Sequence, residues 1–257
     1  MSMHTEIHLD QAELSEVAAA ILALEHSDNA LVIRTGKRQQ LARSDWSQLL
    51  QEQCHLTLDA RQYSYDENLV LEPWWEISNQ PDKANSYAYS TTPQPFHNDN
   101  AWFADPAEIN FFVMEKQAVS GGEQLIYPVS RLINDLQALD ASLFDDLTTI
   151  PVTIRKGGDD FQNLTPIITL EDGGRVYWNY YRTVKTDPHV NDMCERFFAF
   201  LKQQEGSSST YSVRCETGDS LAFNDQRLLH ARTAFVAHQP RDRVLYQSMW
   251  RLPRRNP

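Results

Sequence analysis

Cysteine is scarce in this sequence of 257 residues, which contains only Cys54, Cys194 and Cys215. The three cysteines are odd in number and widely spaced, and no Cys-x-x-Cys pair occurs. Disulfide scaffolds of small secreted proteins carry an even set of cysteines in a short chain. The pattern therefore excludes such a scaffold and favours reduced thiols in a cytosolic protein.

Long hydrophobic runs are also missing from the sequence. No apolar stretch approaches the roughly 18 residues that cross a bilayer as a helix. Residues 1–6 lack the basic start and the following apolar run that mark a secretory signal peptide. We therefore expect a cytoplasmic protein that has no membrane partner.

Basic residues are outnumbered, because 23 Lys and Arg stand against 35 Asp and Glu, for a formal net charge of -12. Nucleic acids attract basic surfaces, so this balance argues against a nucleic-acid partner. The hydrophobic share of 41% is that of an ordinary globular protein. A chain of this length buries a large core without disulfides, and we expect one domain over residues 1–257.

Helical periodicity recurs along the chain, where apolar residues return every three or four positions. Ser44 and Ser130 are placed to cap two of the helices that this spacing predicts. The predicted helices cover, in chain order, residues 10–24, 44–53, 130–139, a following segment to 147, and 190–203.

Short apolar runs bounded by turn residues predict strands elsewhere. The predicted strands cover residues 30–33, 108–115, 123–129, 153–155, 167–170, 175–181, 212–214, 220–223 and 243–250. Asp172-Gly173-Gly174 is typical of a hairpin turn, whereas residues 55–95 show little periodicity and predict long loops with short strands. Many strands and a few packing helices predict a mainly β fold, a double-sheet barrel with helices outside.

The segment Phe96-His97-Asn98-Asp99 carries an imidazole and a carboxylate two positions apart. On an extended segment alternate side chains point to the same face, so His97 and Asp99 can bind one ion. His230 lies far downstream, and Arg243 follows it by thirteen residues. Two histidines and one carboxylate on one face of a metal leave the opposite positions open, which suits a non-haem Fe(II) that also holds a co-substrate and O2.

Each of these residues also has an ordinary structural explanation. His97 could cap a turn, and His230 could be a satisfied core histidine. Asp99 between two asparagines could form an Asx turn, and Arg243 could pair with a surface carboxylate. Their occurrence together, in this order and at this spacing, favours the iron interpretation.

In combination the motifs resemble the taurine dioxygenase-like family of Fe(II)/2-oxoglutarate oxygenases, and within it the clavaminate-synthase and butyrobetaine-hydroxylase type. The similarity covers roughly residues 86–250, with the His-x-Asp triplet, the Gly-Gly-Glu turn at 121–123, the Gly-Asp turn at 218–219 and the distal His230-Ala231-Arg232. The resemblance implies a double-stranded β-helix, which is a jelly-roll of the cupin type. It implies His97, Asp99 and His230 as ligands of Fe(II), with 2-oxoglutarate and O2 as co-substrates.

The resemblance also implies that Arg243 pairs with the distal carboxylate of 2-oxoglutarate, which a guanidinium can meet bidentately. Arg241, two residues earlier, is the second candidate for this role. The family often places a hydroxyl residue after the Gly-Gly turn and its acidic residue to help hold 2-oxoglutarate. Gln124 stands at that position here, and its longer amide can still donate an N–H.

The implied reaction hydroxylates a substrate C–H while 2-oxoglutarate is converted to succinate and CO2. Desaturation or cyclisation would need only altered positioning of the substrate. The carboxylate of Asp99 argues against halogenation, because related halogenases carry a small residue there. Gln247 occupies the position at which taurine-type enzymes hold a sulfonate with an arginine, which argues against a sulfonate substrate.

Candidate substrate-binding residues flank the metal motif and a predicted strand. They are Asn100, Trp102, Phe103, Tyr181, Arg182 and Arg232. Asn100 and Arg182 suit a polar or anionic group, whereas Arg232 could either orient the loop of His230 or touch the substrate. The expected substrate is a small polar metabolite, such as an amino acid or a biosynthetic intermediate, and a homo-oligomer is left open.

Two other classes of function compete with the dioxygenase. A cupin-like metalloenzyme, such as a zinc hydrolase or an isomerase, would act without 2-oxoglutarate. A non-catalytic barrel would bind a small molecule without consuming O2. Metal analysis together with a 2-oxoglutarate titration separates these alternatives from the dioxygenase.

Overall fold

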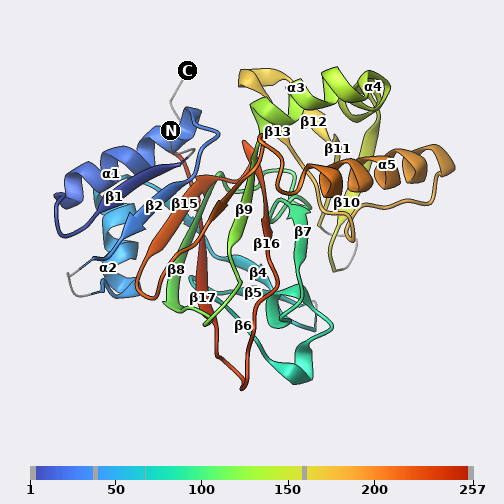
Figure 1. The fold of residues 1–257 in the computed structure, drawn as a ribbon. Coiled ribbons are helices and arrows are strands. Elements are labelled where there is room, and N and C mark those ends of the chain that lie inside the picture. Colours follow the sequence, from blue (N-terminus) through green and yellow to red (C-terminus); the bar gives the residue numbers. More distant parts are fainter. Residues whose placement is uncertain (1–3, 37–39, 67, 158–160, 254–257) are drawn as a thin grey trace.

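Two β-sheets form the centre of the computed structural model, which describes residues 4–36, 40–66, 68–157 and 161–253 (Figure 1). The larger sheet has seven strands in the order β1 (Thr5–His8), β2 (Leu31–Arg34), β15 (Ser220–Asn224), β8 (Ile109–Lys116), β17 (Val244–Arg251) and β3 (Thr57–Asp59), with β6 (Trp75–Ser78) also paired to β17. The smaller sheet has four strands, β14 (Tyr211–Val213), β9 (Gln124–Pro128), β16 (Leu228–Arg232) and β7 (Gln94–His97).

Helices and short ribbons flank the two sheets. The helices are α1 (Leu14–Leu22), α2 (Arg43–Gln48), α3 (Val129–Leu139), α4 (Ala141–Thr149) and α5 (Pro188–Gln204). The ribbons are β4 (Arg61–Tyr63) with β5 (Leu69–Leu71), β10 (Pro151–Arg155) with β11 (Gln162–Pro166), and β12 (Ile168–Thr169) with β13 (Arg175–Val176). In Figure 1, α1 and α2 lie beside the larger sheet, while α3, α4 and α5 gather beside the smaller one. This arrangement confirms the expected mainly β fold, with a double-stranded β-helix core and helices outside.

Short helical turns complete the path of the chain. They are the 3-10 turns Ala23–His26, Pro81–Lys83, Tyr87–Tyr89 and Glu171–Gly173 and the π-turn Leu49–Gln53. The turn Ala23–His26 directly extends α1, and the π-turn Leu49–Gln53 directly extends α2. The weakly periodic region before β7 holds short strands, as its sequence predicted, together with tight 3-10 turns. None of the helices in the described part of the chain is both long and apolar enough to cross a membrane.

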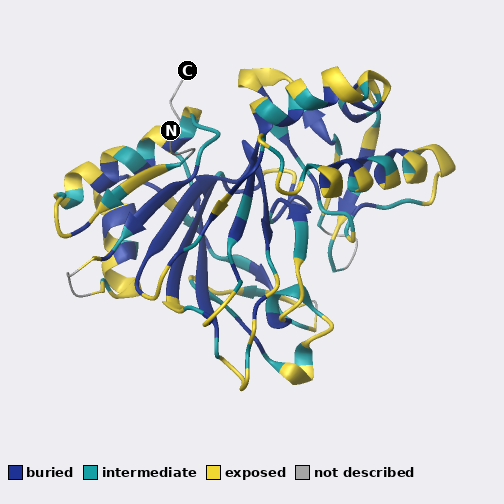
Figure 2. Ribbon diagram, viewed as in Figure 1, coloured by how far each residue is buried: buried dark blue, intermediate teal, exposed yellow. Residues whose placement is uncertain are grey.

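Strand alternation sorts the side chains of the central strands between two cores. Figure 2 shows that these strands are mostly buried. In β8, Phe112 and Met114 point between the two sheets, whereas Phe111 and Val113 pack with residues of α1 and α2. The same parity turns Asn110 toward the space between the sheets. A slip of one residue would exchange the two faces and turn Asn110 away from that space.

The same rule places two polar residues of β16. Leu228 packs in the core between the sheets, and Leu229 and Ala231 pack on the side of the helices. His230 and Arg232 share the parity of Leu228 and therefore point inward. A buried strand that alternates in this way presents polar groups to the interior only where a ligand or a partner group compensates them.

The two predicted serine caps are wrong. Helix α2 begins at Arg43, and the carboxylate of Asp45 accepts a hydrogen bond from the Ala42 N–H at 2.9 Å, so that a carboxylate inside the first turn takes the capping role. Helix α3 begins at Val129 directly after β9. The hydroxyl of Ser130 donates instead to the carboxylate of Asp28.

The strand predicted over residues 175–181 ends at Val176. Trp178 bonds to the loop after β7 rather than to a strand, because its N–H donates to Asn98 Oδ1 at 3.0 Å and its carbonyl accepts from the Asn98 N–H at 2.7 Å. The hairpin before this segment is confirmed, since β12 and β13 pair antiparallel and Asp172 takes a left-handed φ of 52°. Residues 177–182 consequently form an irregular connection.

Candidate active site

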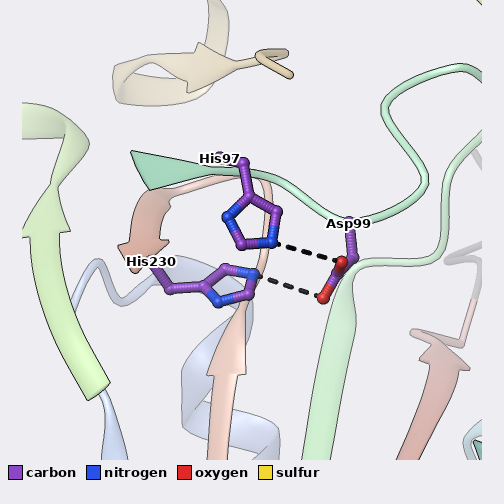
Figure 3. Close-up of side chains that lie close together, drawn as sticks. All are labelled: His97, Asp99 and His230. Atoms are coloured by element: carbon purple, nitrogen blue, oxygen red, sulfur yellow. Dashed lines mark ion pairs between the residues drawn. The ribbon is translucent and has the colours of Figure 1, made fainter. Parts of the chain in front are cut away.

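Three side chains, from two neighbouring strands and the turn that follows one of them, converge on one point (Figure 3). His97 is the last residue of β7 and pairs directly with His230 of β16 in the register of the two strands. The Nε2 atoms of His97 and His230 lie 3.6 and 3.2 Å from Oδ1 and Oδ2 of Asp99. One ligand atom from each residue lies within 4.8 Å of the other two. The structure therefore brings together the three residues that the sequence proposed as metal ligands.

Asp99 reaches this cluster by a route that differs from the expected one. Strand β7 ends at His97, and Asp99 lies in the following turn, where Asn100 has a left-handed φ of 57°. The turn is held by Asn98, whose Nδ2 donates to the Leu228 carbonyl at 2.8 Å. Tertiary hydrogen bonds to β16, rather than the pleat of one strand, place the carboxylate beside the imidazoles.

The donor set fits a divalent iron. Nδ1 of His97 lies 2.9 Å from the Pro95 carbonyl, which can only accept a hydrogen bond, so the lone pair stays on Nε2. His230 Nε2 is buried and faces the carboxylates of Asp99 and Asp225. Metal bonds of about 2.0–2.2 Å place neighbouring ligand atoms roughly 3 Å apart. The separations from Asp99 are close to that value.

The electrostatics of the cluster favour a cation between the three residues. Burial alone would raise the pKa of Asp99, but the charge and hydrogen bond of His230, with those of His97, hold it well below its usual range. Burial alone would lower the pKa of His230, but Asp99 and Asp225 raise it to about 9. In the metal-free protein His230 therefore carries a proton at neutral pH, and a metal ion would take the place of that proton.

Two amides orient the carboxylate of Asp99, and sequence reasoning did not find this role. Asn110 Nδ2 and Gln247 Nε2 lie 2.9 and 2.6 Å from Asp99 Oδ2, and Gln247 also donates to Asn110 Oδ1 at 3.1 Å. Both residues point inward from β8 and β17. A polar residue at an inward position of an apolar strand was the available signal for Asn110.

Asp225 is a second buried carboxylate beside the cluster, which sequence reasoning also missed. Its Oδ1 is buried and lies 3.4 Å from His230 Nε2. Burial raises the pKa of Asp225, although the hydrogen bond and charge of His230 act in the opposite direction. The carboxylate stands at the connection between β15 and β16, where it contributes to the raised pKa of His230.

A cavity of about 810 Å³ opens onto the three residues. Its wall includes most of the residues proposed from the sequence, namely Asn100, Trp102, Gln124, Tyr181, Arg182, Arg232 and Arg243. Aromatic residues from the region of residues 55–95 also line it, and Tyr87 donates to the Tyr181 hydroxyl across 2.9 Å. That region has no periodic signal, so its contribution to the wall was expected only in general terms.

Phe103 and Arg241 do not line the cavity. The ring of Phe103 packs against Tyr63 and Phe161, with the Arg61 guanidinium 4.1 Å from its centre. Phe103 is therefore part of the core behind the site. Arg241 has a left-handed φ of 61° and forms an exposed ion pair with Glu76. This geometry turns its side chain outward and leaves Arg243 as the candidate of the two for 2-oxoglutarate.

Arg243 stands just before β17 and is only 1% exposed. Its Nη2 donates to the Gly122 carbonyl at 3.2 Å, and its buried Nε has no hydrogen-bond partner within the described part of the chain. Gly122 has a φ of 78°, and a Cβ at this position would lie 2.8 Å from Arg243 Nε. The Gly-Gly turn therefore lets the guanidinium lie close to the backbone, with its remaining donors at the cavity.

The comparison with protein families identifies the class of this chain. The model of the taurine catabolism dioxygenase TauD, TfdA family matches residues 3–249, and the chain therefore belongs to this family. Dioxygenase str8 of Strobilurus tenacellus is 24% identical over 236 residues, which are 90% of this chain and 54% of the relative. Gamma-butyrobetaine dioxygenase of Homo sapiens is 27% identical over 175 residues, which are 63% and 45% of the two chains. This chain spans about half the length of the curated relatives it matches.

Solved structures share the fold. An asparagine oxygenase in complex with Fe(II), 2S,3S-3-hydroxyasparagine and succinate superposes with a TM-score of 0.68 at 16% identity, over 92% of this chain and 78% of the other. The non-heme iron oxygenase OrfP in complex with Fe and alpha-ketoglutaric acid gives a TM-score of 0.65 at 14% identity, with the same two coverages. At these identities the likeness concerns the fold, and it confirms the expected architecture.

Proposed function

We propose that this chain is an Fe(II)- and 2-oxoglutarate-dependent oxygenase that hydroxylates a C–H bond of a small polar metabolite. One observation carries the proposal: the inward-facing cluster of His97, Asp99 and His230 shares a cavity with the buried guanidinium of Arg243. A facial set of two imidazoles and one carboxylate suits non-haem iron. A buried arginine in the same cavity suits the far carboxylate of a chelating oxo acid.

Each residue of the site has a defined task in this reaction. His97, Asp99 and His230 hold the iron, and Asn110 and Gln247 keep the Asp99 carboxylate turned toward it. Iron and 2-oxoglutarate together supply the oxidising chemistry when they are bound, with succinate and CO2 as products. The cavity wall positions the substrate and excludes water.

The Arg243 guanidinium orients 2-oxoglutarate by its distal carboxylate. Gln124 is buried at an inward position of β9 and presents an amide to the same cavity. Its N–H donors can contact the co-substrate where relatives of this type use a hydroxyl group. The co-substrate would thus be fixed at both ends, with its oxo acid group at the metal and its far carboxylate at Arg243.

The substrate side of the cavity combines amide, aromatic and guanidinium groups. Asn100, Trp102, Tyr181 and Arg182 are the residues of this wall that the sequence singled out. Such a set suits a small polar molecule such as an amino acid, and the asparagine oxygenase of the same fold is consistent with this class. We further propose that residues 1–257 act as one catalytic domain, in the cytoplasm and without a nucleic-acid partner. The net charge of -12 supports the absence of a nucleic-acid partner. The three buried free cysteines support the assignment to the cytoplasm.

The test is a screen for 2-oxoglutarate-dependent succinate release. The purified chain is incubated with Fe(II), 2-oxoglutarate, O2 and a panel of amino acids and small polar acids. We expect succinate in stoichiometric amounts with a hydroxylated product, and its loss in Asp99→Ala and His230→Ala. Arg241→Gln, which removes an exposed guanidinium outside the cavity, serves as the control. Turnover supported by Zn(II) without 2-oxoglutarate would instead identify a hydrolase or isomerase.

A further inference from the structure

Two buried guanidinium groups stand in the wall of the active-site cavity. Arg232 is 3% exposed and Arg243 is 1% exposed, and both line the cavity. Their Cζ atoms lie 5.2 and 5.4 Å from the centre of the same ring, that of Phe235. Within the described ranges of the chain, neither guanidinium has a carboxylate oxygen within 4.0 Å. Buried cations without a counterion are rare in proteins, so this pair needs an explanation.

The hydrogen bonds of the two arginines leave donors unused. Arg232 Nη2 donates to the carbonyls of Ser90 and Thr92 at 3.0 and 2.9 Å, and Arg243 Nη2 donates to that of Gly122 at 3.2 Å. The Nε–H of each arginine is buried and has no hydrogen-bond partner among the residues that the structure describes. Unsatisfied buried N–H groups on two cations indicate that their acceptor belongs to a ligand rather than to the protein.

The carboxylate whose charge acts on Arg243, that of Glu123, does not supply that acceptor. Glu123 contributes a weak attraction to Arg243, but its carboxylate is engaged elsewhere. The Thr233 hydroxyl donates to Glu123 Oε2 at 2.5 Å, and Arg214 pairs with Oε1 at 3.2 Å. An anion for the two buried arginines must therefore come from a ligand in the cavity.

The electrostatics of the two arginines also favour an anion in the cavity. Burial first, and then repulsion from Arg232, lowers the pKa of Arg243 to about 9. The two charges are thus close enough to oppose each other in the ligand-free protein. A carboxylate between them would relieve both the repulsion and the cost of burial.

We propose that Arg232 is a second ligand of the distal carboxylate of 2-oxoglutarate, which is held between the guanidinium groups of Arg232 and Arg243. This inference rests on the proposed function. A carboxylate has two oxygens with about four acceptor sites, so it can satisfy donors from two arginines at once. Arg232 is accordingly assigned to the co-substrate rather than to the substrate. The site should discriminate strongly between oxo acids that carry a distal carboxylate and those that lack one.

Arg232 also has a structural role that the test must separate from this one. Its bonds to the Ser90 and Thr92 carbonyls tie the loop before β7 to β16. Loss of that tie alone would weaken the binding of any oxo acid to a similar extent. Loss of a carboxylate ligand would weaken only the binding of oxo acids that have a distal carboxylate.

The experiment compares two ligands by calorimetry on the anaerobic, Fe(II)-loaded full chain. The ligands are 2-oxoglutarate and 2-oxopentanoate, which keeps the chelating end and replaces the distal carboxylate by a methyl group. We expect Arg232→Gln to weaken 2-oxoglutarate binding by about 10- to 100-fold, as for a lost charge-assisted hydrogen bond. Binding of 2-oxopentanoate should stay within about twofold. Arg241→Gln is the matched control and should bind both ligands like the wild type.

Arg232→Lys provides a second variant, because it keeps a cation that can reach the two carbonyls if the glutamine variant does not fold. It should retain 2-oxopentanoate binding and lose part of the preference for 2-oxoglutarate. Unchanged 2-oxoglutarate binding, or an equal loss for both ligands, would overturn the role of Arg232 alone. A wild-type chain that binds neither oxo acid would overturn the proposed function, and this inference with it.

Discussion

His97 and His230 are direct partners on two antiparallel strands, and the centres of their imidazole rings lie 4.3 Å apart. The pairing of β7 with β16 therefore positions two of the three proposed metal ligands, and Asp99 joins them from the turn after β7. Sites built on strands are positioned more precisely than sites built on free loops. The geometry of the site consequently depends on the register of this strand pair.

Removal of the Asp99 carboxylate should abolish metal binding. Asp99→Ala takes away the charged ligand and leaves the proton on His230 without its principal partner. We expect the affinity for Fe(II) to fall by more than about 100-fold, since even supporting residues of metal sites are worth about 10- to 100-fold. Anaerobic titration with Fe(II) measures the change. Retention of stoichiometric iron by this variant at micromolar concentration would contradict the assignment.

The amide of Gln247 should act through Asp99 rather than on the substrate. Gln247→Leu keeps the size of the side chain but removes the donor 2.6 Å from Asp99 Oδ2. We expect Fe(II) affinity to fall by about tenfold, with little change in the affinity for 2-oxoglutarate once the site is loaded with iron. Gln247→Glu, which would place a second negative charge beside Asp99, should also change the affinity for Fe(II). If Gln247→Leu changes the KM of the substrate and leaves iron affinity intact, the residue is a substrate contact instead.

Binding of Fe(II) should release a proton below about pH 9. The pKa of His230 is raised to about 9 in the metal-free protein, whereas a ligating imidazole must be neutral. The apparent affinity for Fe(II) should therefore rise with pH, by up to tenfold per unit, and level off above that pKa. Anaerobic calorimetry at pH 7.5 in two buffers of different ionisation enthalpy counts the protons.

Asp225→Asn provides the control for this pH dependence. The substitution removes a charge that raises the pKa of His230, so the affinity should level off at a lower pH. Proton release near zero at pH 7.5 in the unsubstituted chain would show that His230 is already neutral before the metal arrives.

A methyl group at Gly122 should disturb the 2-oxoglutarate site specifically. Gly122→Ala would place its Cβ 2.8 Å from Arg243 Nε, and Gly206→Ala has nearly the same φ of 79° but no atom within 4 Å. Both changes carry a backbone cost of about 1 kcal/mol, because alanine disfavours positive φ. Only Gly122→Ala should raise the KM for 2-oxoglutarate, by about tenfold or more for a weakened charge-assisted contact. Equal KM values for 2-oxoglutarate in the two variants would show that the Gly-Gly turn does not support the Arg243 site.

Much of the site follows from local patterns. The His-x-Asp triplet and the distal histidine can be read directly from the sequence, whereas β8 and β16 are buried on both faces and show no apolar–polar alternation that would mark their inward side chains. Family resemblance then supplied the order of the metal ligands and the candidate arginines.

The choice between Arg241 and Arg243 as the 2-oxoglutarate ligand could not be made from local sequence patterns. Regular alternation would put both side chains on one face, but the left-handed φ of 61° at Arg241 turns its guanidinium outward to Glu76. The strand expected through Tyr181 ends at Val176, because the backbone of Trp178 bonds to Asn98 of another segment instead of to a neighbouring strand. Both outcomes depend on partners that are remote in sequence.

The amino-acid sequence by itself therefore determined the family, the mainly β architecture and the three residues that meet at the proposed metal centre. Only the tertiary structure decided which groups support them: the amides of Asn110 and Gln247 on Asp99, and the approach of Arg232 to Arg243 around Phe235. The physical reason is that periodicity specifies which face a side chain takes. The identity of its neighbour is set by how distant strands pack against each other.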